Sequence, residues 1–419
     1  MSFQQGLSGL NAASSSLDVI GNNISNASTV GFKSGSANFS DIYAASLGIV
    51  SGAKIGIGVG VGAVQQQFTQ GNLTTTNNPL DLALNGGGFF RLSDEGAISY
   101  TRNGQFHIDN GGYIINDQRA RLTGYPVAAN GTITPSNPVE LQISAGQIAP
   151  LASSDPLAGE MRAVLNLDSR GSVPAVTPFD FSDPETYNYS TALTVFDTLG
   201  VVHNLTTFYV LNGTAAPGEW TVHATLDGAN PQVVSGSNPG GNLVFNTSGA
   251  LDPASALRTL PTWNLTTGAA TPWSPGVMDF TGTTQYGSGS NVDRLTQGGF
   301  TSGSLVGVGV NADGIVQGRY SNGQTRNMGQ VVLATFADPN GLLSLGNNQW
   351  SLTSLSGPEL IGAPASGSRG VIQSAAVEDS NVDLTKALVD MITAQRNYQA
   401  NAQTIKTQDQ IMQTLVNLR

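Results

Sequence analysis

Residues 2–33 read SFQQGLSGLNAASSSLDVIGNNISNASTVGFK, and this stretch decides how the chain begins to fold. Its apolar side chains follow alternating steps of four and three residues, at Phe3, Leu7, Leu10, Leu17 and Ile24. Ser14 and Gly21 fill the two remaining places of that series. Such spacing puts an apolar stripe on one side of an α-helix and is typical of helices that pack on other helices. Because Ser, Asn, Ala and Gln line the other side, residues 1–30 are predicted to form a polar-faced amphipathic helix.

Residues 380–419 repeat this pattern at the other end of the chain. The same rhythm runs through Leu384, Leu388, Met391, Tyr398, Ala402, Ile405, Met412 and Val416. Gln395 and Asp409 interrupt it, and a second apolar line begins at Ile411, Leu415 and Leu418. Ser380 followed by Asp383 resembles a capping box, although Asp383 could itself be the cap. We therefore expect a second long helix, and the apolar residues of both helices are the predicted self-assembly surface.

Charge divides the chain in the same way. Only 11% of the 419 residues are Asp, Glu, Lys or Arg, against about 25% in an ordinary soluble domain. The net charge is −11; residues 1–33 contribute zero and residues 383–419 contribute +1, so the middle carries −12. Near-neutral helices of many copies can crowd together without repulsion, while an acidic middle stays solvated. The alternative is that the two helices simply pair within one monomer.

Composition excludes several classes of partner and site. An acidic chain with a pI near 4.6 has no electrostatic footprint for nucleic acid. No run approaches 18 apolar residues, so no membrane insertion is expected. The absence of cysteine removes disulfides, thiolate catalysis and Cys-bound metals. No Lys or Arg precedes Lys33 and no apolar signal core is present, so the N-terminus does not resemble a cleaved Sec signal.

The middle of the chain is predicted to be β-structure. FFRL, AISYT, QFHI and YIIN, between residues 89 and 116, alternate with the turn clusters SDEG, RNG and DNGG. A similar tract returns as LVGVGV, IVQGRY and GQVVLATF between 305 and 336, with NADG and SNGQ as its turns. Further strands are expected at STALTVFD, NLTTFYV and EWTVHATL between 190 and 226. Two β tracts around an insertion indicate a discontinuous domain.

The predicted fold is therefore mostly β with long α-helical termini, in which discontinuous β domains are nested between coiled-coil-forming helices. Residues 1–30 and 380–419 would form a terminal helical domain and 31–75 a connecting segment. The first β domain would comprise 76–147 and 292–379, and the inserted outer β domain 148–291.

Candidate chemistry is sparse. GIGVGVG at 56–62 has glycines spaced as in a dinucleotide site, but QQQFTQGNLTTTNNPLD follows where that site needs a helix. A small-residue extended segment packed on a neighbour is the preferred interpretation. His107, His203 and His223 lack metal-site spacing, and neither a Walker A loop nor a G-x-S-x-G elbow occurs. Carboxylate pairs from distant positions stay possible. The sequence predicts no enzyme, cofactor or metal.

Three segments together resemble a known family. DVIGNNISNASTVGFK at 18–33 resembles the signature of the rod and hook proteins, the axial proteins of the bacterial flagellum. The matching positions are Asp18, Gly21, Asn22, Asn23, Asn26, Gly31, Phe32 and Lys33. QRNYQANAQTIKTQDQIMQTLVNLR at 395–419 is similar to the family's C-terminal helix. PLDLALNGGGFF at 79–90, followed by YTRNGQFHIDNGGYIIN at 100–116, is typical of its longer members.

The length and the insertion resemble the hook branch of this family. The resemblance implies a structural subunit of the basal body and hook, exported by the flagellar type III apparatus and needed for motility. Many copies would form a helical polymer, a curved hollow tube that acts as a universal joint transmitting torque from rod to filament. It would meet the distal rod protein, the hook cap and the hook–filament junction proteins outside the cell. A distal rod-type protein with an insertion, or a secreted β-rich carbohydrate-binding protein, is the alternative.

Overall fold

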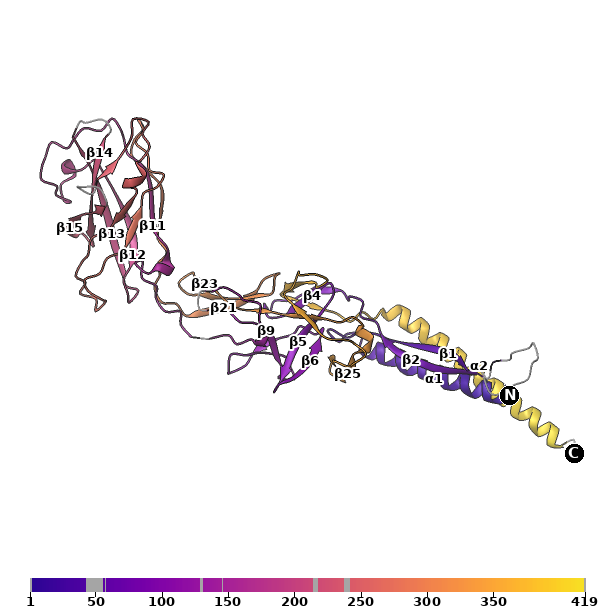
Figure 1. Cartoon of the computed structure of the whole chain (residues 1–419). Coiled ribbons are helices and arrows are strands. Elements are labelled where there is room, and N and C mark those ends of the chain that lie inside the picture. Colours follow the sequence, from indigo (N-terminus) through magenta and orange to yellow (C-terminus); the bar gives the residue numbers. More distant parts are fainter. Residues whose placement is uncertain are drawn as a thin grey trace. The chain divides into compact units, whose positions relative to one another are not determined.

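A computed structural model describes residues 2–42, 56, 58–128, 131–144, 146–213, 218–236 and 242–417. The chain forms two compact units. Unit 1 comprises Met1–Ala145, Val306–Arg319 and Thr325–Arg419, and unit 2 comprises Gly146–Leu305 and Tyr320–Gln324. A mostly β chain with a helix at each end was predicted, and the structure confirms it (Figure 1).

The helical part of unit 1 consists of α1 (Ser2–Ser25), α2 (Leu384–Asn417) and one hairpin. The two helices lie antiparallel, because Gly6 faces Ile405 and Gly9 faces Asn401. Strands β1 (Gly35–Ile42) and β2 (Gly58–Gln66) pair antiparallel and pack along α1 (Figure 1). Helix α1 ends five residues before the predicted boundary at residue 30. Asn26 binds the carbonyl oxygen of Asn22 and the Thr29 hydroxyl, and such side-chain bonds compete with helix continuation.

The β part of unit 1 interleaves the two tracts that flank the insertion. Its main sheet has the order β21-β22-β23-β9-β5-β6-β26-β25. The strands are β5 (Phe89–Asp94), β6 (Ala97–Thr101), β9 (Arg121–Tyr125), β21 (Leu305–Val310), β22 (Ile315–Tyr320), β23 (Thr325–Val331), β25 (Leu343–Gly346) and β26 (Gln349–Ser351). Early strand β9 pairs with late strand β23, and early strand β6 pairs with late strand β26. The two tracts therefore build one sheet.

Shorter strands extend and flank this sheet. β7 (His107–Ile108), β8 (Ile114–Ile115), β10 (Val139–Glu140), β24 (Leu333–Thr335) and β27 (Leu360–Gly362) branch from it. β4 (Leu82–Asn85) pairs with β28 (Val371–Ser374), and β3 (Leu73–Thr75) pairs with β29 (Ala376–Glu378). An aromatic cluster fills part of the core with edge-to-face contacts among Phe68, Phe89, Tyr100, Phe336 and Trp350. These pairings bring the segments next to both helices onto the same β scaffold.

Unit 2 has two sheets that share one core. One sheet has the order β16-β18-β19-β11-β20, and the other has β12-β13-β14-β15 with β17 beside β14. Their bounds are β11 (Met161–Asn166), β12 (Tyr189–Phe196), β13 (Val202–Asn212), β14 (Glu219–Leu226), β15 (Ala229–Val233), β16 (Ser235–Gly236), β17 (Leu243–Val244), β18 (Leu257–Thr259), β19 (Val277–Asp279) and β20 (Asn291–Thr296). Leu165, Tyr209, Trp220, Phe245 and Phe280 meet in the core. The unit reaches Leu305, whereas the sequence-based boundary lies at residue 291.

Among the described residues, five tight turns share one arrangement. Each starts with an Asn or Asp whose side chain accepts the backbone N–H four positions on; these are Asp109, Asn116, Asp197, Asn246 and Asn311. The fourth residue of each turn has a positive φ; these residues are Gly112, Arg119, Gly200, Gly249 and Gly314. Glycine adopts that conformation at little cost, so Arg119, with φ +67°, is the exception.

In the described residues, four short 3₁₀ turns each begin at the proline of an Asp-Pro pair. They are η1 (Pro156–Ala158), η2 (Pro184–Thr186), η3 (Pro253–Ser255) and η4 (Pro339–Gly341). In each one, the carboxylate of the preceding Asp accepts the backbone N–H two positions on. Asp is a preferred N-cap and Pro suits the first helical position, so sequence alone explains these turns.

Candidate self-assembly surface

The contact between α1 and α2 is built on small residues. A Cβ on Gly6 would lie 3.1 Å from Ile405 Cγ1, and one on Gly9 would lie 2.8 Å from Asn401 Oδ1. Ala13 and Ala394 are buried. The two helices therefore do pair within the monomer. On α1 the contact uses Gly6 and Gly9, which lie outside the predicted apolar stripe, whereas on α2 it includes Ile405, which belongs to that stripe.

Much of the predicted apolar stripe is left exposed. On α1, Phe3 is 50% exposed and Leu7 is also exposed, whereas Leu10, Leu17 and Ile24 are half-buried. On α2, Leu384, Leu388, Tyr398 and Met412 are exposed, the last to 59%. Met391, Ala402 and Ile405 are half-buried, and the Val416 side chain lies outside the described residues. Val389, Ile392 and Ile411 add exposed apolar side chains to the same helix. Within the described chain, the helix pair thus keeps an apolar surface.

The other face of α1 holds the β1–β2 hairpin. Gln5 donates to the Gly56 carbonyl oxygen, and Ser8 Oγ accepts the Val59 N–H. Gly58 lies against Ser8, where a Cβ would overlap the hydroxyl. Of the glycine-rich stretch at 56–62, residues 58–62 belong to strand β2, and Ile57 lies outside the described residues. No helix opens after these glycines, which removes the context that a dinucleotide site requires.

The motif at 18–33 ties the end of α1 to its surroundings. The Asn23 amide bonds both the N–H and the carbonyl oxygen of Gly35, each at 2.8 Å. Gly31, with φ +71°, donates to the Glu378 carbonyl oxygen, and a Cβ there would lie 2.6 Å from Asn103 N. A small cavity of about 270 Å³ is lined by Asp18, Val19, Asn22, Phe32, Lys33, Gly35, Val64 and Gln66. Gly21 has open space beside it. Most of the motif is thus structural.

Lys33 of the motif is fully buried although its side chain is charged. Its Nζ lies 2.6 Å from Glu378 Oε1 and donates to the Thr69 carbonyl oxygen at 2.7 Å. Glu378 also receives Arg102 Nη1 at 3.3 Å and the Gly71 N–H at 2.9 Å. Burial lowers the pKa of Lys33, against the opposing pull of the Glu378 carboxylate, and burial also lowers the pKa of Arg102. The cluster joins the segments that follow α1 and precede α2.

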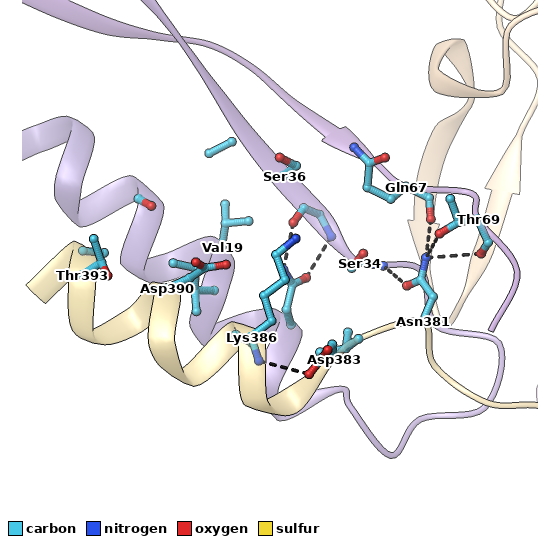
Figure 2. Close-up of a pocket in the computed structure, with 18 of the residues that line it drawn as sticks. Val19, Ser34, Ser36, Gln67, Thr69, Asn381, Asp383, Lys386, Asp390 and Thr393 are labelled. Atoms are coloured by element: carbon cyan, nitrogen blue, oxygen red, sulfur yellow. Dashed lines mark hydrogen bonds between the residues drawn. The ribbon is translucent and has the colours of Figure 1, made fainter. Parts of the chain in front are cut away.

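The start of α2 is fixed by polar contacts. Asp383 Oδ1 accepts the Lys386 N–H at 3.0 Å, so Asp383 is the N-cap, as one of the two sequence alternatives proposed. Asn381 accepts the Ser34 N–H and donates to the Gln67 and Thr69 carbonyl oxygens (Figure 2). A groove of about 680 Å³, lined by both polar and apolar side chains, opens here between α1, β1 and α2. Figure 2 shows the Lys386 side chain extending from α2 into this space.

The described residues offer little for catalysis. They contain no group of three or more His, Asp or Glu side chains placed to hold a metal, and no described helix is long and apolar enough to cross a membrane. His203 and its partners Asp197 and Asp227 form a hydrogen-bonded group in unit 2. The features that stand out are the exposed apolar helix surface and the groove beside it.

Family models match four parts of the chain in order. Residues 3–33 match the flagella basal body rod protein, and residues 83–149 match the flagellar hook protein FlgE/F/G D1 domain. Residues 166–300 match the flagellar basal body protein FlaE D2 domain, and residues 373–418 match the flagellar basal body rod FlgEFG protein C-terminal model.

Relatives of known function match over the whole length. The flagellar hook protein FlgE of Escherichia coli K12 is 43% identical over 427 residues, covering 100% of both chains. The chain belongs to the flagellar hook protein family. The hook protein FlgE of Salmonella typhimurium is 42% identical over 428 residues, again with full coverage of both chains. That of Borreliella burgdorferi is 29% identical over 454 residues, covering 100% of this chain and 99% of the relative.

Hook proteins are structural and non-enzymatic, so this chain is a structural subunit of the hook and not an enzyme. The crystal structure of the Helicobacter pylori flagellar hook protein FlgE2 is similar in fold, with a TM-score of 0.53 and 12% identity. The match covers 73% of this chain and 100% of that one.

Proposed function

We propose that copies of this chain polymerise through α1 and α2 into a curved hollow tube that works as a universal joint. The observation that carries the proposal is an exposed apolar surface on α1 and α2. This surface remains although the two helices already pack on each other within one molecule. Phe3, Leu7, Leu384, Leu388 and Met412 are exposed although the two helices are paired. Covering such side chains with other copies would contribute up to about 1.5–3 kcal/mol for each one that becomes fully buried.

We further propose that different parts of the subunit resist twisting and allow bending. We place the helices in an inner layer around the channel, the β part of unit 1 in a middle layer and unit 2 outside. Apolar helix contacts would persist through each rotation and resist twisting. The outer layer, rich in Gly, Thr and Asn, would exchange water-bridged contacts with its neighbours at little cost as the tube bends. Removing 148–291 is expected to leave tubes that bend abnormally, whereas removing 383–419 is expected to abolish polymerisation.

The partners follow from the position of the hook. The lower end of the tube would meet the distal rod protein, and the growing tip would meet the hook cap. The hook–filament junction proteins would later cover the finished end. We propose that the subunit passes through the flagellar type III export apparatus and reaches an extracellular site attached to the basal body. The absence of cysteine avoids misplaced disulfides during that passage.

Electron microscopy of flagella tests this role. In a strain that lacks the gene, basal bodies are expected to end at the rod with no hook or filament, and complementation should restore both. Truncated rods would favour a distal rod-type role instead. Intact hooks in the deletion strain would contradict the proposal.

A further inference from the structure

Helix α2 extends beyond helix α1 at one end of the helix pair. Because Gly6 faces Ile405 and Gly9 faces Asn401, Ser2 at the start of α1 lies beside residue 409 or so of α2. Helix α2 continues to Asn417 with no described residue of α1 beside it, an overhang of about 12 Å. Ile411 is 48% exposed and Met412 is 59% exposed on this overhang. The C-terminal end of α2 is therefore an uncovered helix with apolar side chains.

The opposite end of the same pair holds the groove. Val19 and Asn23 of α1, Ser36 of β1, and Asn381, Lys386 and Asp390 of α2 line it. The groove has both polar and apolar walls, as would suit a helix that carries Ile and Met among Gln and Thr. Lys386 extends into it from α2, and its ammonium group forms no ion pair within the described residues (Figure 2).

Lys386 is the only basic side chain that lines the groove in the described part of the chain, and Asp383 and Asp390 line it too. Asp409 stands where the overhang begins and is exposed, with Gln413 Nε2 as its hydrogen-bond partner at 3.0 Å. Lys386 and Asp409 are 23 residues apart on one straight helix, a distance of about 35 Å, so they cannot meet within one molecule. They can meet between two copies. In such a contact, Lys386 of one copy would lie near the C-terminal end of α2 of the other copy, where a positive charge interacts favourably with the helix dipole.

We propose that the α2 overhang of one copy docks in the groove of a second copy, with Lys386 of one paired to Asp409 of the other. This inference rests on the proposed polymerisation and names the end-to-end contact within it. A contact that uses different surfaces of the two copies can repeat from copy to copy, and it generates an open helical polymer when the rotation between copies does not close into a ring. The distance between successive copies in the polymer would then be set by the length of the helix pair.

Cysteine crosslinking tests this contact, because the chain contains no cysteine of its own. Full-length Lys386→Cys and Asp409→Cys variants would be polymerised separately and as a mixture, then oxidised with copper phenanthroline. The mixture should give a disulfide-linked dimer, and each variant alone should not. A variant with both changes should give a ladder of covalent oligomers. If the wild type forms tubes in the same buffer but the mixture gives no dimer, the inference is wrong and the proposed function stands. If the wild type forms no polymer, both are wrong.

Charge reversal provides the second arm. Lys386→Asp and Asp409→Lys should each lower the sedimented polymer about tenfold, and the double variant should return to within about threefold of wild type. Acidic residues suit the first turn of a helix and basic residues suit its C-terminal end, so neither change should unfold α2. Arg294→Asp, an exposed charge change in unit 2, is the matched control and should polymerise normally. Equal polymer from all variants would overturn the pairing.

Discussion

Lys33 and Glu378 lie 345 residues apart in the chain, yet Lys33 Nζ is 2.6 Å from Glu378 Oε1 and both side chains are fully buried. The pair connects the segment after α1 to the segment before α2. Gly31 reinforces it by donating to the Glu378 carbonyl oxygen at 2.7 Å. Both helices consequently leave the β part of unit 1 from one fixed junction. Such a junction would transmit torque between the helical and β parts without slack.

Breaking this pair should destabilise unit 1. Glu378→Gln leaves the Lys33 and Arg102 charges buried without their carboxylate, which typically costs about 3–5 kcal/mol. Urea unfolding followed by circular dichroism would measure the loss. Lys33→Met with Glu378→Gln should recover part of it, because the double change removes the Lys33 charge together with its partner. The exposed pair of Arg170 and Asp168 is the control, and Arg170→Met should cost less than about 1 kcal/mol. Equal costs at the two sites would contradict the role of burial.

Unit 2 should lose stability in mild acid through His223. Burial lowers the pKa of His223, whose ring stacks on Phe179 with the centroids 4.0 Å apart. The His223 pKa in the unfolded chain is about 6.5, so on acidification the unfolded chain takes up a proton before the folded chain does. The free energy of unfolding therefore decreases as the pH is lowered from about 6.5 to the lower pKa that His223 has in the folded chain. His223→Gln should flatten that fall. An NMR titration giving His223 a pKa above 6.5 would overturn the prediction.

Arg119→Gly should stabilise unit 1. Arg119 is exposed and holds φ +67° at a turn position where the four equivalent turns have glycine. Relief of a left-handed conformation is worth about 1 kcal/mol. Arg119→Ala keeps a Cβ and should give no such gain, which separates backbone strain from loss of the charge. Thermal unfolding of the two variants makes the comparison, and an equal effect of both would refute it.

Two glycines of α1 should respond in opposite ways to alanine. Gly9→Ala would place a Cβ 2.8 Å from Asn401 Oδ1, forcing the two helices or the Asn401 side chain to shift. Gly21 has no neighbouring atom within 4 Å, so Gly21→Ala should stabilise the helix by up to about 1 kcal/mol. Far-ultraviolet circular dichroism during heating would show the two melting shifts. Stabilisation by both changes would mean that the helix contact at Gly9 is loose.

Local patterns in the sequence predicted both helices and many of the strands and turns, but not the β1–β2 hairpin, which lies in the expected connecting segment at 31–75. Strands such as β5 and β22 alternate or cluster apolar residues between Asx and Gly turns, and those signals lie within a few residues. The face of α1 that meets α2 could not be predicted, because Gly6 and Gly9 carry no hydrophobic signal, whereas their neighbour Ile405 on α2 belongs to the predicted stripe. No local sequence pattern predicts the Lys33–Glu378 ion pair either, because the two residues are brought together only by the strands between them. The family resemblance alone drew attention to Lys33.

The central claim is that the exposed apolar surface of the helix pair is buried between copies in the tube. Leu388 is 44% exposed on α2, and Leu157 is 76% exposed in unit 2. The most direct measurement is sedimentation and negative-stain microscopy of the full-length chain carrying Leu388→Asp or Leu157→Asp. We expect Leu388→Asp to remain monomeric with an unchanged circular dichroism spectrum, and Leu157→Asp to form tubes. Normal tubes from Leu388→Asp would contradict the account.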